Sequence, residues 1–245
     1  MISSVFNALI FQPFYNGLIL LINLLPFLDA GVIVIIFTII VKIILLPLSV
    51  KASKSQLQMK SIEKDLNVIK EKYKDNKEEQ TKQTLEYYKV NHINPFAGIF
   101  VLLIQLPIII GLYRVFLTSG LPKINSALLY HFVSSPAAGS INMVFLGLTN
   151  IAQKSIVLAL IAGITTYYQI SLSTGATQNT GGGKQNDIAR AMTTQMKYFF
   201  PVIVVFISYS ISGALALYWI TSNVFSIAQE MWIKKKYHKT PPIVV

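Results

Sequence analysis

A single lysine interrupts the first long apolar run of the chain, in the stretch FTIIVKIILLPLSVK at residues 37–51. A lysine near the centre of a membrane helix costs about 2.5–3.5 kcal/mol on insertion scales. Two explanations fit Lys42. Its four-carbon stem could carry the ammonium toward the membrane surface, because Leu48 at the end of the run lies only about 9 Å further along a helix. Alternatively, Lys42 is a functional cation inside the bilayer, solvated by water and small polar groups.

Residues that could catalyse a reaction are few. The chain has no cysteine, which removes disulfides, thiolate zinc sites and iron–sulfur ligation. The acids outside residues 51–92 are Asp29, Asp187 and Glu230, the histidines of the chain are His92, His131 and His238, and no two of these fall at metal-ligand spacing. We therefore expect no catalytic residue, no metal site, no cofactor and no enzymatic activity.

Small polar side chains recur inside the other apolar stretches. Those singled out here are Gln105, Ser208, Thr221, Ser222 and Asn223. We expect no Asp or Glu to be available in the membrane to neutralise Lys42, so a water-filled cavity lined by such groups is the better solvent for it. Interhelical hydrogen bonding is the commoner use of these groups, and both interpretations stay open. Tyr218 and Trp219 could likewise be aromatic residues at the membrane interface.

The composition indicates a polytopic membrane protein, because 53% of the 245 residues are hydrophobic and only 13% are charged. The last of four long apolar runs has about 34 residues, too many for one crossing of a ~30 Å hydrocarbon core. Ser212 and Gly213 near its middle predict a tight turn, which gives five spans. The predicted transmembrane helices are 31–50, 93–118, 155–172, 197–212 and 213–233.

The segments outside these spans are more polar. Residues 51–92 show apolar residues at near-helical spacing before the turn sequence YKDNK, which predicts a cytoplasmic helical hairpin. Residues 119–154 are predicted as an external loop, the Gly/Thr/Asn-rich 173–196 as a flexible cytoplasmic loop, and 234–245 as a basic cytoplasmic tail. In residues 1–30, Gln12, Asn16 and Asn23 fall on one helical face. This pattern predicts an amphipathic helix in the outer interface, with a sixth span as the alternative.

Basic residues set the orientation. No lysine or arginine precedes Lys42, whereas ten lysines lie within 51–89 and several more lie in the second loop and the tail on the same side. By the positive-inside rule the amino terminus is outside and the carboxyl terminus cytoplasmic, as five spans also require. Since no basic residue precedes the first apolar run, we expect neither a cleaved export signal nor a transit peptide.

Several long motifs follow one another along the chain: TIIVKIILLPL, the charged hairpin, YKVNHINPFAG, LLIQLPIIIGLYRVF and MKYFFPVIVVF…SGALALYWITSNVFSIAQ. The order of these motifs and their sequences resemble the YidC/Oxa family of membrane protein insertases, in its short bacterial form. In that family five core helices enclose a hydrophilic groove, with one basic residue, normally arginine, in the first core helix. The resemblance implies an all-α polytopic protein of the bacterial cell membrane, with five transmembrane helices around a cytoplasm-open hydrophilic groove and a cytoplasmic helical hairpin.

By this resemblance Lys42 is the groove cation. Gln105, Ser208, Thr221, Ser222 and Asn223 would line the groove, and Tyr218 and Trp219 would contact the passing segment. The implied activity is that of an insertase and chaperone, which moves short hydrophilic tails of nascent membrane proteins across and releases their apolar segments into lipid.

The implied partners are nascent membrane proteins and the lipid bilayer, with the Sec translocon, the ribosome and the signal recognition machinery as candidates and no direct recognition of nucleic acid. Two alternatives stay open. One is an assembly chaperone that translocates nothing. The other is a small anion transporter, for which paired repeats would be usual, and no repeat stands out.

Overall fold

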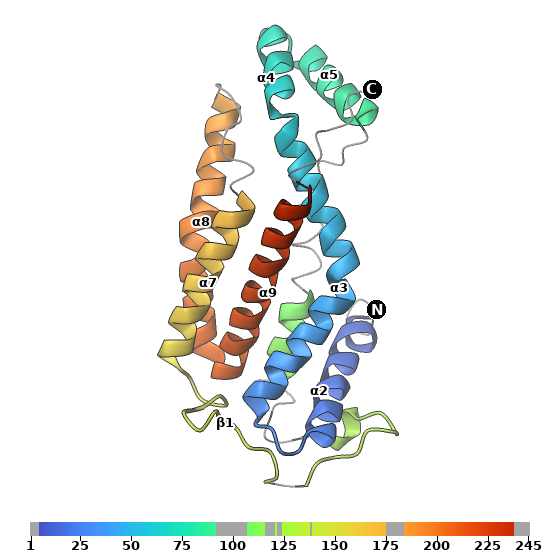
Figure 1. Ribbon diagram of the computed structural model, residues 1–245, viewed down its shortest axis with the longest axis vertical. Helices are drawn as coiled ribbons and strands as arrows, with labels where there is room; N and C mark the ends of the chain where they lie inside the picture. The colour runs from blue at the N-terminus through green and yellow to red at the C-terminus, as the bar shows by residue number, and fades with distance from the viewer. Residues whose placement is uncertain are drawn as a thin grey trace.

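The computed structural model describes residues 5–91, 107–115, 121, 124–137, 139–174 and 184–237, and among these it leaves the side chains of 56, 59, 60, 63, 174, 184–194 and 237 undescribed. Helices make up most of the described chain (Figure 1). The elements are η1 Asn7–Phe11, α2 Gln12–Leu24, α3 Ala30–Ser61, α4 Glu63–Lys72, α5 Lys77–Val90, η2 Ser126–Leu128, β1 Val144–Phe145, β2 Thr149–Asn150, α7 Ile156–Thr174, α8 Lys184–Ile211 and α9 Gly213–Tyr237. Residues 107–115 are also helical.

Three helical segments are long and apolar enough to cross a membrane, namely Asn7–Leu24, Ala30–Ser55 and Ile156–Ser173, and Gln195–Ile211 is a shorter apolar helix. The mainly helical membrane protein expected from the sequence is therefore what the structure shows. Five spans remain a prediction, and most of the predicted span 93–118, with Gln105, lies outside the described residues. Length and composition do not separate an interfacial helix from a span for residues 7–24.

The helices α3, α9, α7 and α8 form an elongated bundle, in which α9 lies between α3 and α7 (Figure 1). One residue, Ser212, connects α8 to α9. Helix α3 continues past residue 50 to Ser61, so the cytoplasmic arm predicted to begin at residue 51 starts as an extension of the membrane helix. At 1.5 Å per residue its 32 residues measure about 48 Å, well beyond a ~30 Å hydrocarbon core.

The start of α3 is fixed by Asp29. Its Oδ1 accepts hydrogen bonds from the N–H groups of Gly31 (2.9 Å) and Val32 (3.0 Å), and its Oδ2 accepts one from Leu146 in the turn between β1 and β2 (3.2 Å). A Cβ at Gly31 would lie 2.3 Å from a ring carbon of Phe145, so this close approach requires glycine. These contacts set the depth and rotation of α3, and hence the position of Lys42.

The polar face of α2 contacts protein. Asn16, which is 2% exposed, donates to the carbonyl of Leu128 (3.0 Å) and accepts from the N–H of Tyr130 (2.6 Å). Asn23 donates to the carbonyl of Ser134 (2.7 Å). The backbone of the loop predicted to be external therefore supplies hydrogen-bond partners for two of the polar residues that the sequence placed on one helical face.

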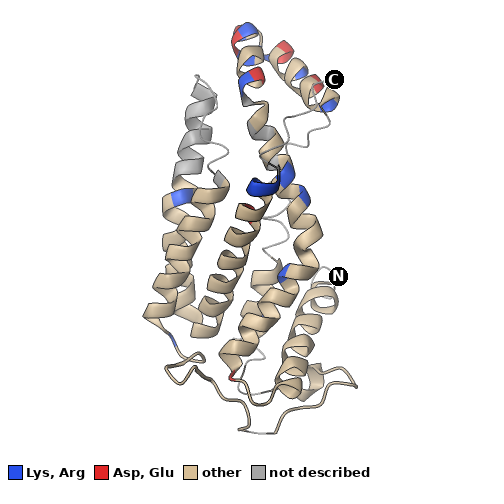
Figure 2. Ribbon diagram, viewed as in Figure 1, with Lys and Arg blue, Asp and Glu red and all other residues tan. Residues whose placement is uncertain are grey.

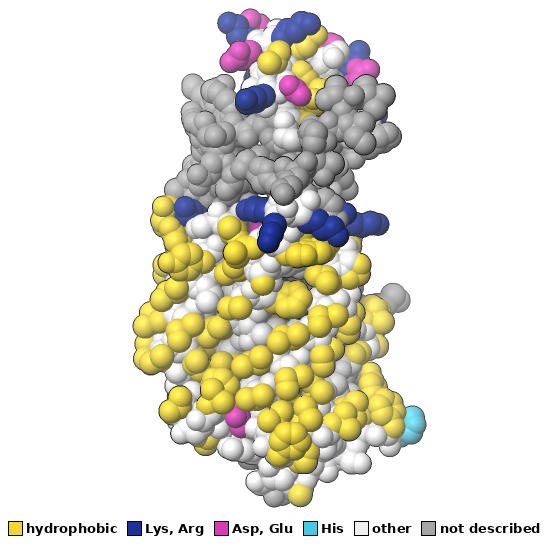
Figure 3. Space-filling model, in the orientation of Figure 1, with side chains coloured by type: hydrophobic (Ala, Val, Ile, Leu, Met, Phe, Trp, Pro, Cys, Tyr) yellow, Lys and Arg dark blue, Asp and Glu magenta, His cyan; other side chains and the backbone are white. Residues whose placement is uncertain are grey.

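Apolar and charged side chains are separated along the long axis of the bundle. The outward face of α3 exposes Ile39, Ile40, Ile43, Ile44 and Leu48. Figure 3 shows hydrophobic side chains covering the visible face of the bundle, with a band of lysines at the end that carries α4 and α5. Figure 2 shows most of the acids and many of the other lysines beyond that band, on the α4–α5 hairpin. This belt, bounded by lysines at one end, is the pattern of a membrane-embedded bundle.

Candidate functional site

Lys42 lies on the side of α3 that faces α9. Its Nζ donates a hydrogen bond to Oγ of Ser226 on α9 at 3.1 Å, and the side chain is half-buried. Lys42 is 12 residues into α3, about 18 Å from its start by helical rise. Among the described residues no carboxylate lies within ion-pair distance of it. The ammonium therefore keeps donors that a further acceptor could use.

Two further hydrogen bonds continue the polar contact between the helices. Ser49 donates to Oε1 of Gln229 at 2.9 Å, and Ser53 donates to Oε2 of Glu230 at 3.5 Å. The residue numbers of the bonded pairs increase together along α3 and α9, so the two helices run in the same direction. We call Lys42, Ser49, Ser53, Ser226, Gln229 and Glu230 the α3–α9 seam. It leads from Lys42 toward the end of the bundle that carries the lysine band.

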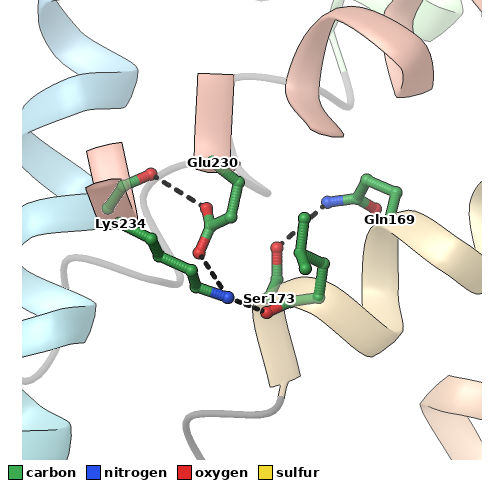
Figure 4. Close-up of polar contacts among 6 residues, drawn as sticks. Gln169, Ser173, Glu230 and Lys234 are labelled. Atoms are coloured by element: carbon green, nitrogen blue, oxygen red, sulfur yellow. Dashed lines mark hydrogen bonds and ion pairs between the residues drawn. The ribbon is translucent and has the colours of Figure 1, made fainter. Parts of the chain in front are cut away.

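Glu230 corrects one expectation. It lies within residues 213–233, the last predicted span, and it is 8% exposed, so an acid is present at the edge of the membrane region. Lys234 neutralises it: the Nζ lies 3.6 Å from Oε1 of Glu230 and donates to the carbonyl of Leu172 at 2.6 Å. Figure 4 shows the two charged groups pointing toward each other from α9, beside Gln169 and Ser173 of α7. This cluster joins α3, α7 and α9 near the lysine-rich end of the bundle.

Asn223 lies on the other side of α9, against α7. Its Nδ2 is within hydrogen-bond distance of Oγ1 of Thr166 (2.7 Å), Oγ1 of Thr165 (3.1 Å) and the carbonyl of Ala162 (3.5 Å). Ser222 beside it is 3% exposed. In this arrangement Asn223 serves as an interhelical hydrogen-bond donor, which was the alternative to groove lining.

The remaining predicted residues in the described part of the chain have other surroundings. Thr221 donates to the carbonyl of Leu217 within its own helix (2.8 Å). Ser208 is fully buried on α8, and its Oγ has no hydrogen-bond partner among the described residues. Tyr218 and Trp219 are 2% and 7% exposed and pack in the main hydrophobic core. A substrate contact at these rings would therefore need the helices to move.

The observed partner of Lys42, Ser226, is absent from the set predicted from the sequence. A signal for it exists, because Ser222, Ser226 and Gln229 recur three to four residues apart and so form one polar stripe on α9. In the described part of the chain there is no group of three or more His, Asp or Glu residues that could hold a metal ion.

Comparison with known proteins gives a consistent result. A family model described as 60Kd inner membrane protein matches residues 23–240. A protein of Fusobacterium nucleatum named Membrane protein insertase YidC is 32% identical over 206 residues, which cover 84% of this chain and 86% of the relative. A protein of the same name from Clostridium tetani is 32% identical over 210 residues, covering 85% and 83% of the two chains. A longer one from Nitratidesulfovibrio vulgaris is 29% identical over 206 residues, 35% of its length.

The match therefore extends over nearly the whole sequence, and over most of the length of two relatives that carry the insertase name. It includes the α3 segment with Lys42 and all of α7, α8 and the polar stripe of α9. The chain belongs to the 60Kd inner membrane protein family, the YidC/Oxa family that its motifs resemble.

Proposed function

We propose that this protein is a membrane protein insertase of the bacterial inner membrane, whose substrates are nascent membrane proteins. Family membership and the names of the relatives support the general activity. Lys42 is the observation that carries the mechanism. It is a cation in the middle of an apolar helix, joined to a seam of polar groups that leads to the lysine-rich end of the bundle.

A substrate's short hydrophilic tail enters along the α3–α9 seam. A carboxylate of the tail accepts a hydrogen bond from Nζ of Lys42, and the seam hydroxyls and amides replace part of the water that the tail loses. The adjoining apolar segment of the substrate lies against the exposed isoleucines of α3 and moves into lipid. Partition of that segment supplies the driving force, at roughly 25 cal/mol per Å² of apolar surface removed from water.

The wider architecture of the proposal follows the sequence-based expectations. Five spans enclose a groove open to the cytoplasm, the amino terminus is outside, and the α4–α5 hairpin and the tail receive the substrate on the cytoplasmic side. Gln105, Ser208, Thr221, Ser222 and Asn223 remain proposed groove residues, and Tyr218 and Trp219 become substrate contacts only after the helices separate. The ribosome, the signal recognition machinery and the Sec translocon are proposed partners of the basic hairpin.

The mechanism needs no bond-breaking chemistry. Its steps are solvation of a polar tail, attraction of its charge and release of an apolar segment into lipid. We therefore propose a non-catalytic role, in which α3 and α9 supply the solvating groups and substrate partition supplies the free energy.

The test uses the full chain reconstituted in vesicles. A single-span substrate with a short acidic tail is added, and translocation is scored as protection of the tail from external protease. Protection above that in protein-free vesicles is the expected result. If the substrate becomes folded and membrane-bound while its tail stays digestible, the chain is an assembly chaperone and the insertase proposal fails. A flux of small anions without tail protection would instead favour the transporter.

A further inference from the structure

A second feature lies on the surface of the bundle formed by α7 and α8, on the far side of α9 from the α3–α9 seam. An open groove of about 480 Å³ runs between α7 and α8, within the ~300–1,000 Å³ range of small-molecule sites. Its lining includes Leu160, Gly163, Ile164, Tyr167, Pro201 and Val202. The seam mechanism makes no use of these residues.

Close approach of the two helices forms the floor of the groove. A Cβ at Gly163 would lie 2.3 Å from Cγ2 of Val205 and 3.2 Å from the carbonyl oxygen of Pro201, so only glycine permits this spacing. Ile164 and Val202 on the walls are 56% and 63% exposed. An apolar groove with such exposed walls, inside the hydrophobic belt, is open to the acyl chains of the bilayer.

One end of the groove carries a cation. The Nζ of Lys197 lies 5.5 Å from the ring centroid of Tyr167 and 5.6 Å from that of Tyr198. These two rings lie 5.9 Å apart and so hold the ammonium at the mouth of the groove. No carboxylate and no hydrogen-bond acceptor of the described residues is within bonding distance of this Nζ. The positive charge is therefore available to an anionic group from outside the protein.

Because of Pro201, the backbone carbonyl of Lys197 is a further hydrogen-bond acceptor at the same end. Proline has no N–H, so the helical hydrogen bond from position 201 to the carbonyl of Lys197 cannot form. The mouth thus presents an ammonium and a carbonyl lacking that helical bond, next to two tyrosine rings of the kind found at membrane interfaces. The rest of the groove is apolar.

We propose that the α7–α8 groove is a binding site for one anionic phospholipid. The phosphate binds Nζ of Lys197, a headgroup hydroxyl donates to the carbonyl of Lys197, and an acyl chain lies along Gly163 and Ile164. The charge at one end only, followed by an apolar trough, matches an amphiphile with a single anionic head. A transmembrane helix would match the apolar trough but would supply no partner for the cation.

The test is photolabelling of the full chain in phosphatidylcholine vesicles that contain a trace of acyl-diazirine phosphatidylglycerol or acyl-diazirine phosphatidylcholine. Labelled peptides are identified by mass spectrometry. One lysine near a membrane surface contributes about 1 kcal/mol toward anionic lipid, which corresponds to roughly fivefold. We therefore expect peptides covering 160–168 and 201–205 to be labelled about fivefold more by phosphatidylglycerol.

Two variants separate the headgroup contact from the trough. Lys197→Gln should remove the preference while keeping basal labelling, whereas Lys235→Gln, an exposed lysine on α9, should leave it intact. Val202→Trp, at an exposed wall position that is not part of the core, should block labelling by both lipids.

Equal labelling by the two lipids in the wild type, or an unchanged preference in Lys197→Gln, would overturn the proposal. So would cross-links from the groove to a second copy of the chain in place of lipid adducts. Helical content and elution volume of each variant establish that it is folded. Because the readout is lipid labelling, the outcome is independent of whether the protein inserts substrates.

Discussion

Replacement of Lys42 by methionine tests the role of the seam directly. Methionine keeps most of the stem and removes the charge, so the change addresses the ammonium and not the packing of α3. At about 4 Å and an effective dielectric constant of about 20, a carboxylate and an ammonium attract by about 4 kcal/mol. Desolvation of both groups offsets part of this, and hydrogen bonds to charged groups contribute about 1.5–3 kcal/mol net. Insertion of an acidic tail should therefore slow roughly ten- to hundredfold.

The charge of the tail makes this prediction specific. A substrate whose tail carries asparagine and glutamine in place of aspartate and glutamate should insert into Lys42→Met vesicles within about twofold of the wild-type rate, because its tail gains no Coulomb term. Lys42→Arg should retain most of the acidic-tail activity, since arginine preserves the positive charge. Lys51→Met, an exposed lysine nine residues further along the same helix, is the matched control.

Stability distinguishes this effect from misfolding. Removing a cation from the membrane region relieves up to about 2.5–3.5 kcal/mol, so Lys42→Met should melt no lower than the wild type. The assay is protease protection of the tail over time, beside thermal melting of the same preparations. An equal loss for acidic and neutral tails would refute the proposed role of the ammonium and assign Lys42 to packing. No loss for either tail would leave snorkelling as its explanation.

Three further changes test the contacts that hold the site in place. Asn16→Leu leaves a half-buried carbonyl and a half-buried N–H without this partner, at up to about 1–3 kcal/mol each, and should lower the thermal midpoint in detergent; an unchanged midpoint would contradict the loop contact. Lys234→Met unpairs a buried carboxylate and should cost about 1–3 kcal/mol and speed hydrogen exchange in the last turn of α7, whereas Lys235→Met should do neither. The hydrogen bond to Asp65 raises the pKa of Tyr87 from 10.0 to about 12. The folded value lies above the unfolded one, so this contact stabilises the α4–α5 hairpin below pH 10 and is lost as the pH approaches about 12. Asp65→Asn should return the ultraviolet titration of Tyr87 toward 10.0.

The helical nature of the protein could be predicted because it depends on local pattern. Long apolar runs form membrane helices wherever they occur, since every backbone polar group must be satisfied within the segment. Lys42 could be identified for the same reason, as a charge in an otherwise apolar run stands out without knowledge of its surroundings. What surrounds it could not be identified in this way.

The partners of the polar groups depend on packing between distant segments. Lys42 meets Ser226 across 184 residues of sequence, and the choice of Ser226 over Ser222 depends on the rotation of α9. Asn16 finds its partners in a loop more than a hundred residues away. No Asp or Glu was expected to be available in the spans to neutralise Lys42, yet Glu230 lies within the last of them, where an isolated acid is costly. Lys234, one turn further along, removes most of that cost.

The ion pair between Glu230 and Lys234 also affects which substrate tails the α3–α9 seam would favour. The described side chains of the seam and its edge include two ammonium groups, on Lys42 and Lys234, and one carboxylate. That carboxylate is held by Lys234 at 3.6 Å and by Ser53 at 3.5 Å, and Lys234 is held in turn by the carbonyl of Leu172. The charge that remains uncompensated is therefore the one on Lys42, deeper in the bundle. In the proposed mechanism, a carboxylate in an incoming tail is attracted past the lysine-rich end of the bundle to the deeper cation on Lys42, so we expect acidic tails to be the preferred cargo.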